Sequence, residues 1–429
     1  MKKIVKLSLS FILIFAITSS VFANGLSLNS LGSRALGMGG AFVALSNDAT
    51  AIYWNPAGLS DQKASVLAYF TGVMPIGSYK VDAANIDAST ASNIYPTGGL
   101  LANYRMDKLA LALGVYVPAG LGAEWDATDF AGANAKDTEF LSKIGVITIS
   151  PAVAYQVTDQ FSVGLAVNIS YAMFDMKQFI AQGVALGLGF RQFEESSTGL
   201  GVGATLGLRY KFNDQLTAGA TVRLATKVAM SGTAKNTLFP ALPTIPAMGI
   251  VPGPGESDFD RDVTWPLWIG GGLAYKPNKC LTLELDAQYS QWSELDKLVA
   301  VYDNSYWKLA MASQGNDEFK LDWKDAVQIR LGGELMVTPV TAVRLGYYYD
   351  PAPAPDETLN VLFPSSTNHV ITAGCGYSFG NYTVEAAAEY LLGAERDVKA
   401  YPSISAPENM PGIHQLDVFA FSVGLHIGL

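Results

Sequence analysis

Residues 281–290 read Leu-Thr-Leu-Glu-Leu-Asp-Ala-Gln-Tyr-Ser and alternate between apolar and polar side chains at every step. Successive side chains of a β-strand point to opposite faces of the sheet, so this segment predicts a strand with one apolar and one charged face. Residues 161–170, 200–209 and 419–429 alternate in the same way, with small or polar residues on the second face. The apolar face would form the core of a soluble β-sandwich, whereas it would meet lipid in a membrane barrel.

The connections between such segments favour the barrel. Strands are predicted near residues 62–74, 96–106, 109–118, 143–157, 160–174, 198–212, 215–230, 262–276, 280–294, 324–337, 341–350, 367–379, 381–391 and 414–429. Very short turns, such as Asn213-Asp214, alternate along the chain with long segments. Transmembrane barrels have this asymmetry between periplasmic turns and external loops, and closing the sheet removes edges that lipid cannot solvate. We therefore predict an all-β fold, a transmembrane antiparallel β-barrel of about fourteen strands.

The composition agrees with a membrane protein and excludes other classes. Hydrophobic residues make up 49% of the 429 residues and charged residues only 15%, whereas soluble domains carry roughly 25% charged residues. The 28 Lys and Arg do not exceed the 38 Asp and Glu, so we expect no nucleic-acid partner. Two cysteines cannot build a disulfide framework or a cysteine-based zinc site. We predict no metal and no cofactor.

The first residues predict export. Lys2, Lys3 and Lys6 form a positive region, residues 7–17 are apolar, and Ala23 ends a stretch typical of a cleavage site. We expect residues 1–23 to be a signal peptide. After it, no stretch of about 18 apolar residues is free of charges and turn residues, which argues against a helical membrane protein.

Residues 24–60 precede the first strand and do not alternate. A segment this short cannot build its own core, so we expect it to fill the barrel lumen. Its motifs resemble the N-terminal hatch of the FadL/TodX outer-membrane transporters: Gly32-Ser33-Arg34-Ala35, Gly39-Gly40-Ala41, Asn47-Asp48-Ala49 and Asn55-Pro56-Ala57-Gly58-Leu59. Asn55, Pro56 and Ala57 form the most recognisable element. We accordingly divide the chain into a hatch at 24–60 and a barrel at 61–429.

The resemblance implies a function. Members of this family have a barrel of fourteen strands in the outer membrane of Gram-negative bacteria and take up long-chain fatty acids or aromatic hydrocarbons. Ligand enters an apolar groove between the third and fourth external loops, passes the hatch and leaves sideways through a kinked third strand. The hatch is also similar to the start of PorV-like barrels, so a structural or secretion-associated barrel that binds protein partners is the alternative. We expect a monomer whose other partners are outer-membrane lipid and lipopolysaccharide.

The resemblance also directs attention to loops that are unusually apolar. The groove candidates in external loops 3 and 4 are Phe174, Met176, Phe179, Ile180, Leu186, Leu188, Phe190, Leu242, Ile245 and Met248. Exposed apolar patches indicate binding, although these loops could also pack on one another as a lid. Gly114 and Pro118 are the candidates for the kink in the third strand, since both residue types disrupt β-ladders.

The alternation places several charges in the lumen. The inward arginines are Arg105, Arg209, Arg223, Arg330 and Arg344, and the inward acids include Glu284, Asp286, Glu334, Glu385 and Glu389. An arginine could hold a ligand carboxylate, but ion pairs that fill the lumen and fix the hatch are the favoured interpretation. With three histidines far apart in the chain, no nucleophile–base pair is evident, and we predict that the protein is not an enzyme.

Overall fold

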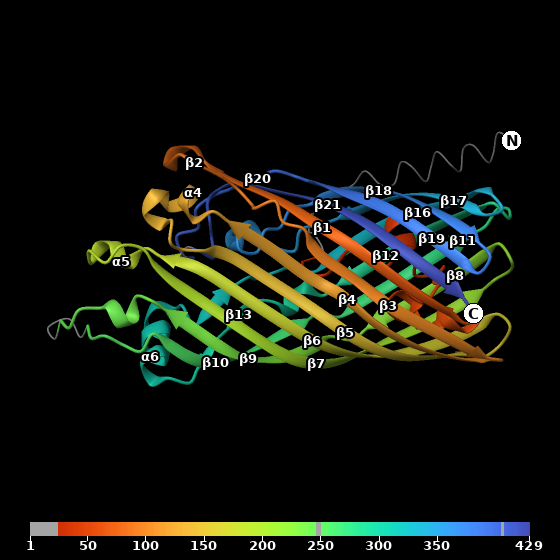
Figure 1. Cartoon of the computed structure of the whole chain (residues 1–429), viewed down its shortest axis with the longest axis horizontal. Coiled ribbons are helices and arrows are strands. Elements are labelled where there is room, and N and C mark those ends of the chain that lie inside the picture. Colours follow the sequence, from red (N-terminus) through yellow and green to blue (C-terminus); the bar gives the residue numbers. More distant parts are fainter. Residues whose placement is uncertain (1–24, 246–249, 405–406) are drawn as a thin grey trace.

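The computed structural model describes residues 25–245, 250–404 and 407–429. The expected signal peptide at 1–23 lies outside the described residues. Figure 1 shows one elongated barrel whose strands are inclined to its long axis. Short turns join the strands at the right-hand end, which we call the turn end, and long connections with small helices gather at the other end, which we call the loop end.

The barrel wall closes on itself. In chain order its strands are β1 (Ser65–Val81), β3 (Tyr95–Met106), β4 (Leu109–Trp125), β5 (Phe140–Gln156), β6 (Phe161–Ile180), β7 (Arg191–Lys211), β8 (Leu216–Arg223) with β9 (Thr226–Asn236), β10 (Glu256–Trp265) with β11 (Trp268–Tyr275), β12 (Leu281–Ser290), β16 (Ala326–Thr338), β17 (Thr341–Asp350), β18 (Asn368–Phe379), β19 (Tyr382–Gly393) and β21 (Gly412–Gly428). Two of these wall strands are each interrupted once, after Arg223 and after Trp265. All neighbours are antiparallel, and β1 pairs with both β3 and β21. The predicted 14-strand antiparallel barrel is confirmed across the described residues.

The two faces of the wall are reversed relative to a soluble protein. On β12, Leu283 and Leu285 are 43% and 46% exposed, whereas Glu284 and Asp286 are 3% and 1% exposed. The apolar side chains therefore cover the outside of the barrel, and the charged ones lie in its interior. A wall with this pattern is suited to lipid outside and a polar lumen inside.

The wall strands extend further toward the loop end than predicted. Because β6 continues to Ile180 and β7 begins at Arg191, the third loop is reduced to residues 181–190. The prediction that Phe174, Met176, Phe179 and Ile180 lie in a loop is therefore wrong, since all four belong to β6. The physical reason is that the inward positions Phe174 and Met176 are apolar and buried, which hides the alternation that identifies a strand.

Small elements cover the loop end. They are η2 (Asp82–Ala84), β2 (Ile86–Ser89), α4 (Ala127–Ala131), η3 (Gly132–Ala135), α5 (Gln182–Ala185), η4 (Phe239–Ala241), η6 (Trp292–Glu294), β13 (Lys297–Val299), β14 (Val301–Tyr302), α6 (Ser305–Gln314), β15 (Glu318–Lys320), η7 (Asp356–Thr358) and β20 (Arg396–Val398). Among the residues with described positions, no helix is both long enough and apolar enough to cross a membrane.

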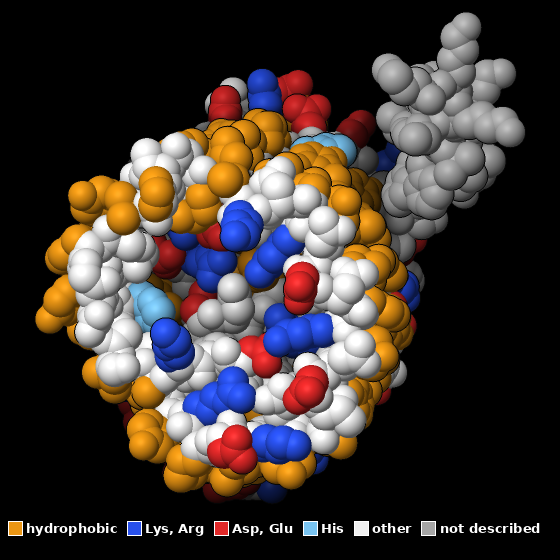
Figure 2. All heavy atoms as spheres, turned by 90° about the vertical axis from the view of Figure 1, so that its right-hand side faces the viewer, with side chains coloured by type: hydrophobic (Ala, Val, Ile, Leu, Met, Phe, Trp, Pro, Cys, Tyr) orange, Lys and Arg blue, Asp and Glu red, His pale blue; other side chains and the backbone are white. Residues whose placement is uncertain are grey.

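The segment before β1 lies inside the barrel, near the turn end (Figure 1). It contains α2 (Ser33–Gly37), α3 (Ala51–Trp54) and η1 (Pro56–Asp61), and we call residues 25–61 the hatch. The apolar side chains of α2, α3 and the segment between them, among them Phe42 and Trp54, are buried. Figure 2, a view onto the turn end, shows hydrophobic side chains on the outer wall, with basic and acidic side chains gathered in the mouth of the barrel.

Candidate functional site

The Asn-Pro-Ala element joins the hatch to the wall. Asn55 Nδ2 donates to the Leu208 carbonyl oxygen of β7 at 3.0 Å. Asn55 Oδ1 accepts the Ala57 N–H at 3.1 Å and so caps η1, which begins at Pro56, a position where a helix needs no N–H donor. The wall opposite carries Gly164, where a Cβ atom would collide with Pro56. At this element the backbone of the hatch therefore lies in close contact with the backbone of the wall.

Two wall carboxylates hold the hatch backbone. Asp286 Oδ2 accepts the N–H groups of residues 42 and 43 at 2.7 and 2.9 Å. Glu284 Oε1 accepts the N–H groups of residues 44 and 45 at 2.7 and 3.0 Å. Buried carboxylates and buried N–H groups are both costly when unpaired, so each side of this contact stabilises the other.

The predicted lumen arginines also contact the hatch. Three donate to hatch carbonyl oxygens at 2.9 Å: Arg209 to Ala44, Arg223 to Tyr53 and Arg330 to Gly39. Arg344 forms ion pairs with Glu334 and Glu385 at 2.7 and 3.0 Å. Arg105 differs, because it lies near a short turn and donates to Asp107. The contacts of Arg209, Arg223 and Arg330 favour a role in fixing the hatch, and Arg344 supports it indirectly through Glu334, which also pairs with Arg34 of the hatch.

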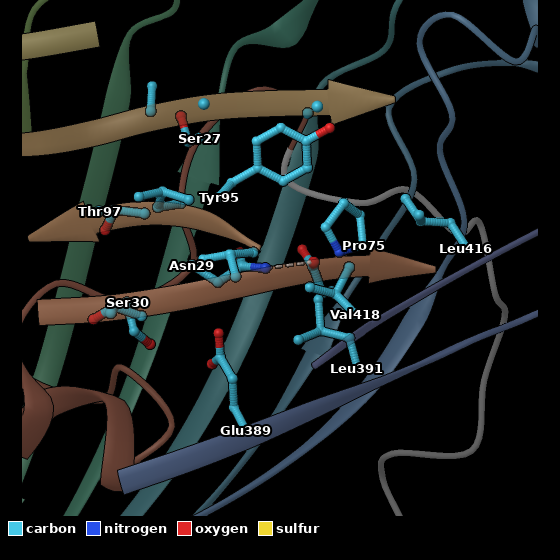
Figure 3. A pocket seen from close by; sticks show the side chains of 18 of the residues that line it. Ser27, Asn29, Ser30, Pro75, Tyr95, Thr97, Glu389, Leu391, Leu416 and Val418 are labelled. Carbon is cyan, nitrogen blue, oxygen red and sulfur yellow. Dashed lines mark hydrogen bonds between the residues drawn. The ribbon is translucent and has the colours of Figure 1, made fainter. Parts of the chain in front are cut away.

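A cavity of about 290 Å³ lies between the beginning of the hatch and the wall, and we call it the inner cavity. Gly25 and residues 27–30 of the hatch line it together with parts of β1, β3, β4 and β5, and with residues 364–366, Asn368, β19 and β21 opposite. Figure 3 shows Tyr95, Leu391, Leu416 and Val418 around this space. Its lining is mainly apolar, with polar groups at a few positions.

The wall next to this cavity is incompletely paired. The ladder between β3 and β4 ends at Gly99 and Tyr116. Beyond it, this side of β4 pairs with the hatch at Ala119, which forms a bridge with Ser27, and then with Thr90 at Trp125. Between those points, residues 95–98 and 117–123 face each other without ladder hydrogen bonds. We call this part of the wall the lateral window. Residues from both of its edges line the inner cavity.

Pro118 produces the irregularity at the window. The pairing of β4 with β5 shifts by one residue between Tyr116 and Ala119, which is a β-bulge that contains Pro118. The hatch occupies the freed backbone groups, because the Leu28 N–H donates to the Pro118 carbonyl oxygen at 3.1 Å. Gly114, the other kink candidate, lies in a regular part of the ladder. The hatch thus contacts β4 where the β-ladder of the wall is interrupted.

A second cavity, of about 380 Å³, opens at the loop end, and we call it the outer groove. Its lining includes Met176, Phe179 and Ile180 from β6, Phe319 from β15, and Met311 from α6. The Phe179 ring packs edge-on against Phe190 and at a tilt against Phe140. Flexible methionines beside aromatic rings suit the binding of ligands of variable shape.

Arg261 is a residue of the outer groove that the sequence analysis missed. Its Nη2 pairs with Glu195 Oε2 at 2.7 Å, and Tyr302 donates to the other oxygen of Glu195 at 3.0 Å. Burial raises the pKa of Tyr302 well above its ordinary value, so it keeps its proton. The rings of Phe174 and Phe259 each lie 5.2 Å from the guanidinium carbon. The inward alternation of Phe259, Arg261 and Val263 was the available signal.

Comparisons with known proteins identify the family. The family model described as outer membrane protein transport protein (OMPP1/FadL/TodX) matches residues 14–413. The chain belongs to this family. It is similar to a 47 kDa outer membrane protein of Pasteurella multocida, with 24% identity over 391 residues that cover 85% of this chain and 86% of that protein.

Solved structures share the fold. The structure of a Pseudomonas aeruginosa FadL homologue matches with a TM-score of 0.77 and 16% identity, and covers 94% of this chain and 99% of its own. The toluene transporter TodX of Pseudomonas putida matches with a TM-score of 0.71 and 17% identity, over 96% of this chain and 100% of its own. The protein is an outer-membrane β-barrel of a family that transports hydrophobic compounds, and it is not an enzyme.

In this FadL/TodX-family barrel only some of the predicted groove residues line the outer groove. Met176, Phe179 and Ile180 line the outer groove, whereas Phe174 lies buried beneath Arg261. The other described candidates do not line it: Leu186, Leu188, Phe190, Leu242 and Ile245. Met248 lies outside the described residues. Within the described residues, no group of three or more His, Cys, Asp or Glu side chains could hold a metal ion.

Proposed function

We propose that this FadL/TodX-family protein takes up hydrophobic small molecules, such as long-chain fatty acids or aromatic hydrocarbons, in three steps. The outer groove captures the ligand, the inner cavity receives it under control of the hatch, and the lateral window releases it into the membrane. The observation that carries the proposal is the position of the inner cavity, which is lined both by the hatch and by the two edges of the lateral window.

The lateral route suits apolar cargo. A ligand that left through the turn end would transfer its apolar surface into water, at a cost of about 0.8 kcal/mol for each CH₂ group. A ligand that moves sideways stays in an apolar environment. The turn end is also closed by the hatch, whose backbone is bonded to Glu284, Asp286 and three arginines. These contacts argue against a porin for polar solutes.

The solved relatives support cargo of this kind. They include toluene transporters from Pseudomonas putida and Ralstonia pickettii and a monoaromatic hydrocarbon channel. The similarity to them is 16–18% in sequence, so it supports the fold and the general class of cargo. The choice between fatty acids and aromatic hydrocarbons depends on the cavities of this chain.

Native mass spectrometry of the purified protein, with extraction of any bound lipophile, tests the proposal. We expect a hydrophobic small molecule to copurify with the barrel at near-stoichiometric occupancy. Phe179→Glu should reduce the rebinding of that molecule, because Phe179 lines the outer groove. An empty barrel that instead copurifies with an exported protein would contradict uptake and favour the PorV-like alternative.

A further inference from the structure

The inner cavity contains buried oxygen atoms that lack hydrogen-bond partners. Among the residues with described positions, Ser30 Oγ, Ser365 Oγ and Asn368 Oδ1 are buried and unpaired, and all three residues line the cavity. The orientation of the Asn368 amide is fixed, because its Nδ2 donates to the Ser366 carbonyl oxygen at 3.1 Å and to Asp350 Oδ2 at 3.5 Å. The unpaired atom is therefore a hydrogen-bond acceptor. An acceptor left unpaired in a buried site calls for a donor from the ligand.

Carboxylates add to these acceptors. Glu389 is 8% exposed, accepts a hydrogen bond from the Tyr348 hydroxyl at 3.2 Å, and lines the cavity. Figure 3 shows it reaching from its strand toward Ser30 and Asn29 of the hatch. Asp350 lines the same space and is bonded to Gln328 and Asn29.

The cavity lacks a matching positive charge. No Lys, Arg or His is present in the described part of its lining. The guanidinium of Arg330 is close to these acids in the lumen, but Arg330 is only 1% exposed and donates to Gly39 and Gln328. A ligand carboxylate in the cavity would lose its hydration, would find no cation to pair with, and would lie near two acidic side chains.

We propose that the inner cavity selects uncharged lipophiles that carry a hydroxyl group, such as long-chain alcohols or phenols, and discriminates against carboxylates. The hydroxyl donates its hydrogen to Glu389 or to Asn368 Oδ1, which line the cavity from β19 and β18, while the hydrocarbon part contacts Leu391 and Val418. This inference rests on the proposed uptake function and narrows its cargo class. It also separates this chain from a carrier of ionised fatty acids.

The outer groove is compatible with the same ligand. Arg261 lines it and keeps two guanidinium nitrogens, Nε and Nη1, without partners among the described residues. A hydroxyl oxygen can accept from such a donor in the groove, and its hydrogen can later be donated in the inner cavity. An ionised carboxylate can satisfy the first site but not the second, because it has no hydrogen to donate.

Photo-crosslinking of the full chain in detergent tests the selectivity. The probes are diazirine analogues of dodecanol and dodecanoate, used at equal concentration and neutral pH, and labelled peptides are quantified by mass spectrometry. We expect dodecanol to label peptides of the inner cavity about tenfold more than dodecanoate does. Glu389→Gln should reduce that ratio several-fold, because it replaces one of the two acids that a ligand carboxylate meets in the cavity. The matched control Glu395→Gln changes an exposed acid at the loop end that lines neither cavity and should leave the ratio unchanged.

The outcomes separate this inference from the proposed function. Equal labelling of the inner cavity by both probes, or a ratio that Glu389→Gln does not change, would overturn the selectivity while leaving uptake intact. If neither probe labels the inner cavity or the outer groove, the proposed uptake function itself fails. As a gain-of-function arm, Thr97→Lys introduces a cation into the lining and should reverse the preference toward dodecanoate. Failure of that reversal in a folded variant would also count against the inference.

Discussion

Arg34 of the hatch and Glu334 of β16 form a bidentate ion pair although they are separated by 300 residues in the chain. Arg34 Nε and Nη2 each donate to one oxygen of the carboxylate at 2.8 Å. Glu334 also accepts from Arg344 Nε at 2.7 Å, and Arg344 continues the network to Glu385. The hatch is thus attached to the wall by charge-assisted hydrogen bonds, which are stronger than neutral ones.

The Arg34–Glu334 ion pair predicts that a substitution at Arg34 destabilises the attachment of the hatch to the wall. Arg34→Gln should lower the stability of the hatch by about 3 kcal/mol, the lower end for breaking a buried ion pair, because Glu334 keeps Arg344. We expect transient openings that appear as current steps in planar bilayers. The control is Lys80→Gln, which removes an exposed ion pair with Asp82 and should conduct like the parent protein. Identical traces for both variants would contradict the anchoring role.

Deletion of residues 24–60 should convert the closed barrel into an open pore. The hatch core residues Phe42 and Trp54 are fully buried in the lumen, so their removal leaves a passage along the lumen of the barrel. We expect a large, steady ion conductance in planar bilayers, with the wall still folded by circular dichroism. If the folded deletion variant conducts no more than the intact chain, the hatch does not plug the barrel.

Phe179→Glu should weaken ligand capture about tenfold, because it replaces an apolar contact by a charge that must be desolvated. Phe179 lines the outer groove, whereas Val184 is exposed on the adjoining loop and lies outside its lining. Val184→Glu is therefore the matched control. Affinity for the copurifying lipophile is measured by native mass spectrometry. Equal affinity of the two variants would refute the position of the groove.

The sequence predicts the wall better than the site, for a physical reason. Strict alternation at residues 281–290 indicates lipid on one side and a polar lumen on the other. It therefore predicts both the strand and the side to which each residue points. Near the loop end the interior itself becomes apolar, as at Phe174 and Met176, and the alternation disappears. Arg261 lies outside the predicted strand because the pattern is inverted on β10, where Asp258, Asp260 and Asp262 are exposed while the inward side chains are buried.

The inner cavity could not be foreseen from the sequence at all. It is formed where the beginning of the hatch, β4 and β19 come together. Barrel closure brings these segments together, and the local sequence pattern of each segment does not reveal it. Pro118 was a partial exception, because proline signals a broken ladder wherever it occurs in a strand. The lumen arginines were predicted by register, but their hatch partners, such as the carbonyl oxygen of Gly39, required the structure.

Deleting Pro118 should close part of the lateral window. The deletion removes the extra residue of the bulge, so β4 can pair with β5 in one continuous register. We expect slower delivery of a fluorescent lipophile into proteoliposome membranes and unchanged binding in the outer groove. Delivery at the parental rate, with the shortened strand confirmed by a structure, would show that the bulge is not needed for release.

Tyr95 is the side chain most directly placed to obstruct the window. It stands on β3 at one edge, and its ring packs over Gly122 of β4 at the other, where a Cβ atom would collide with it. Figure 3 shows the ring beside the inner cavity. Tyr95→Ala should therefore widen the passage and accelerate delivery of the lipophile several-fold, while binding in the outer groove stays the same.

Tyr104→Ala is the control for this change, because Tyr104 lies on the same strand but is 59% exposed on the outer wall. It should deliver at the parental rate. Gly122→Val tests the same contact from β4, because the new side chain must displace the Tyr95 ring. This substitution should alter release in the parent protein but not in the Tyr95→Ala variant. If Tyr95→Ala and Tyr104→Ala behave alike, Tyr95 does not control the window, and the hatch segment bonded to Pro118 becomes the candidate for that control.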